Sequence, residues 1–216
     1  IPIEQARIPT IGRYRSSTKS IGDPNDIERL ADILINAERP AVLFGQQVWA
    51  SGSHGAAIDF IRSLDVPAYM NGASRGMLPE GDPHHFDRTR SDAFKDADVI
   101  LIVGTPFDFR MGYGKRISDA ATLVQIDQSY ATVGKNRDIS LGIAGDPGAI
   151  LKAVEQAASG RISQGLKKKR QEWMSKLRGI EETKLEKLMP IFKSEQNPIH
   201  PSRLAYEINE FLGEDT

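Results

Sequence analysis

The sequence predicts an α/β domain over residues 23–158, built on a doubly wound, mostly parallel, Rossmann-like sheet. Three observations predict this fold. Apolar segments of strand length alternate with amphipathic segments of helix length along this part of the chain. The central segment, Val99–Val103, is an unbroken aliphatic run, which is typical of a strand buried on both faces of a parallel sheet. Nearly every expected strand ends in Gly, Asn or Asp, residues that turns prefer.

The first half of the domain contains two expected helices and two expected strands. Asp23 is placed to cap a helix that begins at Pro24, carries apolar residues at helical spacing and stops before Pro40. After it we expect a strand over 41–44, a helix over 51–64, a strand over 66–70 and a Gly- and Pro-rich loop over 73–86.

The second half repeats the alternation. A short helix over 91–95 precedes the central strand, and two further strands are expected over 122–126 and 139–144. Asp146 then caps a helix that runs to residue 158, with Pro147 in its first turn.

Two flanking segments differ from the domain in composition. Residues 1–22 are irregular and read as an incoming linker, and residues 159–216 form a charged helical extension. In this extension a helix is expected over 164–189, closed by Pro190, and another begins at Pro201. The first of these has only a narrow apolar stripe, which includes Trp173 and Leu177. We therefore expect its packing partner in another domain, and we expect the basic run Lys167–Arg170 to face water.

Composition excludes several classes of function. The net charge of −1 gives no reason to expect nucleic acid or an anionic membrane as a partner. The basic run at 167–170 shares its helix with several Glu residues, so it does not change this expectation. The chain has no Cys, which excludes disulfides, thiolate metal sites and Cys nucleophiles. No apolar run has membrane-spanning length and no signal peptide is recognisable, so we expect a cytoplasmic protein. Without an initiator Met, the chain is taken for a piece of a longer protein.

No catalytic or metal-binding residue is predicted. The sequence contains no G-x-S-x-G elbow, no pair of carboxylates spaced for acid–base work, no P-loop and no G-x-G-x-x-G fingerprint after the first strand. His84, His85 and Asp87 could suggest a metal cluster, but adjacent histidines in a Pro-rich loop are usually solvated.

The predicted binding site lies where the strands end. Carboxyl ends of parallel strands share one sheet edge, and open α/β sheets bind ligands there. Glycines at such ends admit a phosphate close to the backbone, and an acidic residue can accept hydrogen bonds from a ribose diol. We therefore predict an adenine-nucleotide cradle, with the alternative that the glycines serve only the turns. Its candidate residues are Gly45, Gln46, Gln47, Asn71, Gly72, Gly104, Thr105, Asp108, Arg110, Asp127 and Asp146.

The order of short motifs resembles one family. The motifs are Arg39–Gly45, Asp65–Pro67, Arg75–Pro79, Ala97–Gly104, Phe107–Arg110, Ile126–Asp127 and Gly145–Asp146. Over residues 23–154 they resemble the central domain, DHS-like in fold, of thiamine-diphosphate-dependent enzymes of the acetolactate synthase (acetohydroxyacid synthase) type. The closing Asn197–Leu204 looks like the lead-in to that family's diphosphate-binding domain.

The resemblance implies a subunit of three domains, in a homodimer or homotetramer. Thiamine diphosphate and Mg²⁺ lie between the first and third domains of different subunits, and the chemistry is 2-keto acid decarboxylation and carboligation. In acetolactate synthases, which serve branched-chain amino acid biosynthesis, the central domain binds FAD without a redox role; in oxalyl-CoA decarboxylases it binds ADP. The family's activating glutamate and diphosphate motif are absent from this chain, so no catalytic residue is carried over.

The resemblance extends to individual positions of the cradle. Gly45 matches the first glycine of a Gly-x-Gly, but Gln47 replaces the second and would crowd a diphosphate. Gly104 matches the start of the loop that carries Asp108 and Arg110, and a Cβ at position 104 would point at the phosphate path. Asp127 matches the acid at the ribose end.

Two further positions bear on the nucleotide itself. Asp146 matches the Gly-Asp near the adenine. Residues 87–90 stand where flavin-binding members carry a Gly-Met-His-Gly-like turn, and this departure weighs against FAD more than against ADP.

Two alternatives stay open. The chain could be the central domain of an enzyme like 2-hydroxyacyl-CoA lyase or oxalyl-CoA decarboxylase, toward which Phe109–Gly114 leans. It could instead be a dehydrogenase-like or sirtuin-like domain that uses a nicotinamide nucleotide, although the fingerprint of such a domain is absent.

Overall fold

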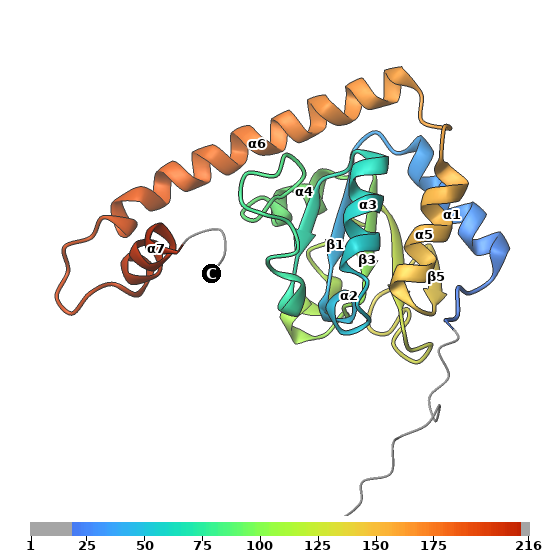
Figure 1. Cartoon of the computed structure of the whole chain (residues 1–216), viewed down its shortest axis with the longest axis horizontal. Coiled ribbons are helices and arrows are strands. Elements are labelled where there is room, and N and C mark those ends of the chain that lie inside the picture. The colour runs from blue at the N-terminus through green and yellow to red at the C-terminus, as the bar shows by residue number, and fades with distance from the viewer. Residues whose placement is uncertain (1–18, 213–216) are drawn as a thin grey trace, which may run out of the picture.

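The computed structural model describes residues 19–212. Most of the expected linker over residues 1–22 therefore lies outside the described residues. The chain folds around one parallel sheet of β1 (Pro40–Phe44), β2 (Ala68–Met70), β3 (Val99–Val103), β4 (Thr122–Asp127) and β5 (Leu141–Ala144) (Figure 1). Their order is β2-β1-β3-β4-β5, and every neighbouring pair is parallel. The predicted doubly wound α/β fold is confirmed.

The central strand is buried on both faces. All five residues of β3 are buried, because β1 and β4 pair with its two edges and helices cover both sides. Side chains alternate between the faces, as the two-residue period of a strand requires. Leu101 and Val103 enter one apolar core, and Ile100 and Ile102 enter the other.

Each core is closed by its own helices. The first lies under α1 (Pro24–Asn36), α3 (His54–Leu64) and α5 (Pro147–Ala158), and α5 packs against both of the other helices. The second lies under α4 (Arg90–Asp96) and the first part of α6 (Gln164–Phe192). The predicted caps form: the carboxylate of Asp23 accepts a hydrogen bond from Asn25 N at 2.8 Å, and that of Asp146 from Ala149 N at 2.9 Å.

Several boundaries differ from the prediction. A short helix, α2 (Gln46–Ala50), begins directly after β1, and the helix expected from residue 51 begins at His54. Strand β2 begins at Ala68 rather than residue 66, because Pro67 has no N–H to give to the ladder. Short 3₁₀ segments, η1 (Gly72–Ser74) and η2 (Phe109–Gly114), occupy loops expected to be irregular.

The first part of α6 packs on this domain, contrary to the expectation of a partner elsewhere. Trp173 and Leu177 are buried in the second core, and Trp173 Nε1 donates a hydrogen bond to Pro40 O at 2.9 Å. Arg170 does not face water: its side chain is fully buried. Its Nε donates to Ala37 O at 3.1 Å, and its other nitrogens donate to Leu34 O and Leu64 O.

The end of the chain is less enclosed. Pro190 does not close α6, which continues to Phe192, because the hydrogen bond that proline removes belongs to the last turn. Helix α7 (Pro201–Phe211) lies against the end of α6, where the rings of Phe192 and Tyr206 stack at 5.3 Å, and it is set apart from the sheet (Figure 1). None of its residues is buried, and Phe211 is 88% exposed. Between residues 19 and 212, no helix combines the length and the apolar character needed to cross a bilayer.

We predict that Arg170→Ala lowers the free energy of unfolding by about 3 kcal/mol or more, because it leaves buried carbonyl groups without donors and opens a cavity. Lys168→Ala is the matched control, since Lys168 is an exposed residue of the same helix. Urea denaturation followed by far-UV circular dichroism measures both. An equal, small loss in the two variants would contradict the role given to Arg170.

Candidate functional site

The strand order reverses between β1 and β3, which makes their carboxyl ends the switch point of the sheet. Gly45 follows β1 and Gly104 follows β3. The two loops are hydrogen-bonded to each other: Gly45 N donates to Val103 O at 2.7 Å, and Gln47 N donates to Gly104 O at 3.2 Å. The switch point is thus occupied by two loops in contact.

Both glycines are required by this loop contact. A Cβ on Gly45 would lie 2.5 Å from the carbonyl oxygen of Gly104 and 2.5 Å from Thr105 Cβ. Gly104 has φ +69°, and a Cβ on it would lie 2.7 Å from Gln47 Cβ. The sequence predicts that this Cβ would point at a phosphate path; in the structure it would point at Gln47, so the glycine permits close packing of the loops.

Gln47 and Asp127 form the polar centre of this edge. Asp127, the last residue of β4, is fully buried. Its Oδ1 accepts hydrogen bonds from Gln47 Nε2 at 3.1 Å and from Ser129 N at 2.8 Å, while Gln47 Oε1 accepts from Gln128 N at 2.9 Å. Asp127 Oδ2 is buried and has no partner among the described residues. A buried carboxylate oxygen without a donor is costly, so this atom is an unmet acceptor at the edge.

The predicted site residues do not all lie together. Gly45, Gln47, Gly104, Thr105 and Asp127 lie together at the switch point. Gln46 is exposed, and a Cβ on Gly72 would lie 3.6 Å from Gln46 Cβ. The side chain of Asn71 turns to Met111, with Nδ2 3.7 Å from Sδ. Asp146 is engaged as the cap of α5 and pairs with Lys19 Nζ at 3.2 Å.

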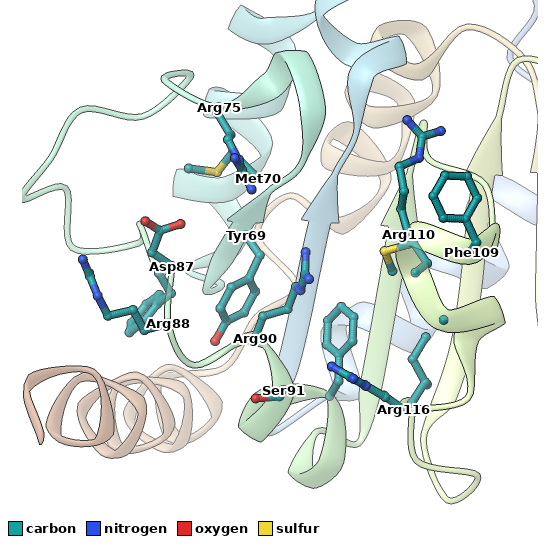
Figure 2. A pocket seen from close by; sticks show the side chains of 15 residues that line it. Tyr69, Met70, Arg75, Asp87, Arg88, Arg90, Ser91, Phe109, Arg110 and Arg116 are labelled. Atoms are coloured by element: carbon teal, nitrogen blue, oxygen red, sulfur yellow. The ribbon is translucent and has the colours of Figure 1, made fainter. Parts of the chain in front are cut away.

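Asp108 and Arg110 form an ion pair in η2. Arg110 Nη2 donates to Asp108 Oδ2 at 2.6 Å, and Asp108 also accepts from Arg110 N at 2.9 Å. The hydrogen bonds from the Arg110 side chain hold the pKa of Asp108 below its ordinary value. The guanidinium of Arg110 is exposed and points away from the cavity described next (Figure 2).

Reasoning from the sequence missed a cavity of about 360 Å³ beside β2, η2 and α4. Buried apolar side chains, among them Tyr69, Phe86 and Phe94, lie along it. Five arginines line it against a single carboxylate, Asp87 (Figure 2). They are Arg75, Arg88, Arg90, Arg110 and Arg116. They come from three segments that are far apart in the sequence, with only Arg88 and Arg90 close together, so no spacing marks the five as a group. The available sign was that residues 87–90 depart from the turn of flavin-binding members.

The histidines rejected as metal ligands have no metal-like surroundings. His84 lies between two carboxylates, with Nε2 2.9 Å from Asp65 Oδ1 and Nδ1 3.3 Å from Asp82 Oδ1. Over residues 19–212, no group of three or more acidic or histidine side chains is arranged to hold a metal ion.

Residues 27–154 match the family described as "Thiamine pyrophosphate enzyme, central domain". Among curated proteins, the chain is 31% identical over 189 residues to the acetolactate synthase large subunit IlvG of Mycobacterium tuberculosis, with 88% of this chain and 33% of that protein covered. It is 28% identical over 199 residues to 2-hydroxyacyl-CoA lyase 2 of Danio rerio, covering 89% of this chain and 31% of the relative. The chain therefore spans about a third of the length of these relatives.

Solved structures show a similar fold. The crystal structure of benzoylformate decarboxylase from Polynucleobacter necessarius superposes with a TM-score of 0.57 at 18% identity, over 70% of this chain and 30% of that one.

We predict that Gln47→Ala lowers the free energy of unfolding by about 1–3 kcal/mol, because buried Asp127 then loses a donor. Gln46→Ala is the control, since it removes the same amide from an exposed neighbouring position. Guanidinium denaturation of the two variants measures the difference. If both variants lose the same free energy of unfolding, the contact between Gln47 and Asp127 does not stabilise the fold.

Proposed function

Because this chain belongs to the thiamine pyrophosphate enzymes as their central domain, we propose that the full-length protein performs 2-keto acid decarboxylation and carboligation. In this proposal the flanking domains hold thiamine diphosphate and Mg²⁺, which supply the carbanion chemistry. The full-length protein acts as a homodimer or homotetramer. The similarity to an acetolactate synthase over 88% of this chain supports the assignment.

This chain's own contribution, in our proposal, is an adenine-nucleotide site at the switch point for ADP or the adenosine half of FAD. The observation that carries it is the buried Asp127, whose Oδ2 has no partner in the described part of the chain. A ribose hydroxyl would satisfy that oxygen. A 2′-phosphate would be repelled by the same carboxylate, so the site favours ADP and FAD over NADP-type nucleotides.

The side chain of Gln47 occupies part of this site. Its amide donates to Asp127 Oδ1, the oxygen that the second hydroxyl of a ribose diol would reach when the first binds Oδ2, and its Cβ faces Gly104. A nucleotide must therefore displace the amide and break its contacts with Asp127 and Gln128. This cost implies modest affinity, micromolar or weaker, equivalent to a binding free energy of about −8 kcal/mol or smaller in magnitude.

A second candidate reaction is the cleavage of the carbon–carbon bond between C1 and C2 of a 2-hydroxyacyl-CoA, which leaves the thioester intact. The similarity to 2-hydroxyacyl-CoA lyase 2 over 89% of this chain favours it. The two reactions differ in the substrate that the full-length protein consumes. Assaying that protein with pyruvate and with a 2-hydroxyacyl-CoA in parallel separates them, because the first reaction releases acetolactate and CO2 and the second releases an aldehyde and formyl-CoA.

We predict that ADP and FAD bind the 216-residue chain with micromolar or weaker affinity in calorimetric titrations. Asp127→Asn should weaken both ligands at least tenfold, because one carboxyl oxygen becomes an amide nitrogen, which cannot accept a hydrogen bond from a ribose hydroxyl. Asp138→Asn, which removes the same charge from an exposed position, should leave them unchanged. Gln47→Ala should tighten binding, since no amide has to be displaced. Absence of binding at millimolar nucleotide would make the edge a scaffold only.

We also predict that the 216-residue chain alone turns over no 2-keto acid, because it lacks the family's activating glutamate and diphosphate motif. Incubation with pyruvate, thiamine diphosphate and Mg²⁺ should release neither acetolactate nor acetoin. Turnover that follows the chain through successive purification steps would refute the assignment of catalysis to the flanking domains.

A further inference from the structure

We propose that the cavity around Arg75, Arg90 and Arg116 binds the phosphate or diphosphate group of a small molecule. This site is separate from the nucleotide edge at Gln47 and Asp127. The three arginines come from the loop after β2, the first residue of α4 and the segment after η2. Figure 2 shows Arg90 in the middle of the cavity, between the segments that carry the other two.

These three arginines lack an acidic partner within residues 19–212. The ion pairs at the cavity join Arg110 to Asp108 at 2.6 Å and Arg88 to Glu181 at 3.9 Å, and neither involves the central three. Asp87 is the one carboxylate among the lining residues. The cavity therefore holds an excess of positive charge that its own side chains do not neutralise.

Of the three arginines, Arg90 is the one that this excess of positive charge destabilises most. It is half-buried, whereas Arg75 and Arg116 are exposed. Burial, followed by the charges of Arg75 and Arg116, lowers the pKa of Arg90, and Asp87 offsets only part of this effect. Like charges that converge on a partly desolvated group destabilise the ligand-free state, and a bound anion removes that penalty.

The segment that carries Arg90 is held in place by α6. The buried carboxylate of Glu181 accepts hydrogen bonds from Asp87 N at 3.0 Å, Arg88 N at 2.7 Å and Thr89 Oγ1 at 2.8 Å. Because Thr89 gives its proton to Glu181, the Tyr69 hydroxyl donates to Thr89 across 3.1 Å. A fixed backbone at residues 87–89 places Arg90 before a ligand arrives, which lowers the entropic cost of binding.

The chemistry of the cavity selects a phosphate-bearing ligand. Guanidinium groups match the oxygens of phosphate in a bidentate manner, and three of them suit a ligand with more than one negative charge. The apolar wall formed by Tyr69, Phe86 and Phe94 suits the organic part of such a molecule. The volume of about 360 Å³ falls within the range of small-molecule sites, about 300–1,000 Å³.

The first experiment titrates the 216-residue chain by calorimetry with inorganic pyrophosphate, ADP and adenosine. Pyrophosphate should bind, and more weakly at high salt, and it should bind equally well when adenosine is already present, because adenosine has no phosphate for the arginines. Arg90→Gln and Arg116→Gln should each weaken pyrophosphate at least tenfold. Arg29→Gln, an exposed arginine on α1, is the control and should bind as the parent does. Absence of pyrophosphate binding at millimolar concentration, or equal binding by Arg90→Gln, would overturn the proposal.

A second measurement separates ligand binding from a structural role. If Arg90 is an unpartnered charge, Arg90→Gln should raise the melting temperature of the ligand-free chain and abolish its stabilisation by pyrophosphate. A lower melting temperature in that variant would show that Arg90 serves the fold, and would sink the proposal. Asp127→Asn should leave pyrophosphate binding intact. Loss of nucleotide binding at Asp127 and loss of pyrophosphate binding at Arg90 are therefore independent outcomes.

Discussion

The side chain of Arg170 joins parts of the domain that would otherwise end in unpaired carbonyl groups. Helices α1 and α3 both finish at the same end of the sheet, and the last carbonyls of a helix have no partner within it. Arg170 reaches Leu34 and Ala37 at the end of α1 and Leu64 at the end of α3. The negative ends of the two helix dipoles also favour a cation there. One buried guanidinium thus fixes where α6 begins its path across the domain.

From Arg170 onward, α6 contacts the domain along one face of the helix. Trp173 donates to the start of β1, Arg178 donates to Pro83 O and His85 O, and Glu181 accepts from the segment before α4. These partners are mostly backbone groups of loops, so the helix adds hydrogen bonds to a segment whose own apolar anchor is the buried Phe86. A helix that looks too charged to pack therefore positions the loops around the arginine-lined cavity. Lys184, one turn beyond Glu181, donates to Arg88 O and pairs with Asp92. Helix α7 has no such contact with the sheet domain among the described residues, and it exposes its apolar side chains.

The two candidate sites differ in the sign and in the exposure of their charged groups. At the switch point the buried carboxyl group of Asp127 has the Gln47 amide as its side-chain partner, so the edge is closed and one oxygen stays unsatisfied. Beside β2 the charges of Arg75, Arg90 and Arg116 are positive, partly exposed and without an ion-pair partner within the described residues, whereas Arg88 and Arg110 are paired. A nucleotide at the first site must displace an amide, whereas an anion at the second would relieve repulsion. Substitutions at the two sites should therefore change the stability of the ligand-free chain in opposite directions.

The sequence by itself determined the parallel sheet, the helices at α1, α3 and α5, and the caps at Asp23 and Asp146. Each of these depends on local spacing: an aliphatic run, an apolar face, or an acid before Pro. Similar reasoning placed Gly45, Gly104 and Asp127 at one edge, because parallel strands end together. Local pattern could not show that Gln47 turns onto Asp127, or that a Cβ at Gly104 faces Gln47. Nor could it show that Arg170 is buried, since an arginine in a basic run normally faces water. Tertiary structure decided these points, because the partners lie 80 residues apart for Gln47 and Asp127 and 133 residues apart for Arg170 and Ala37, and only folding brings them together.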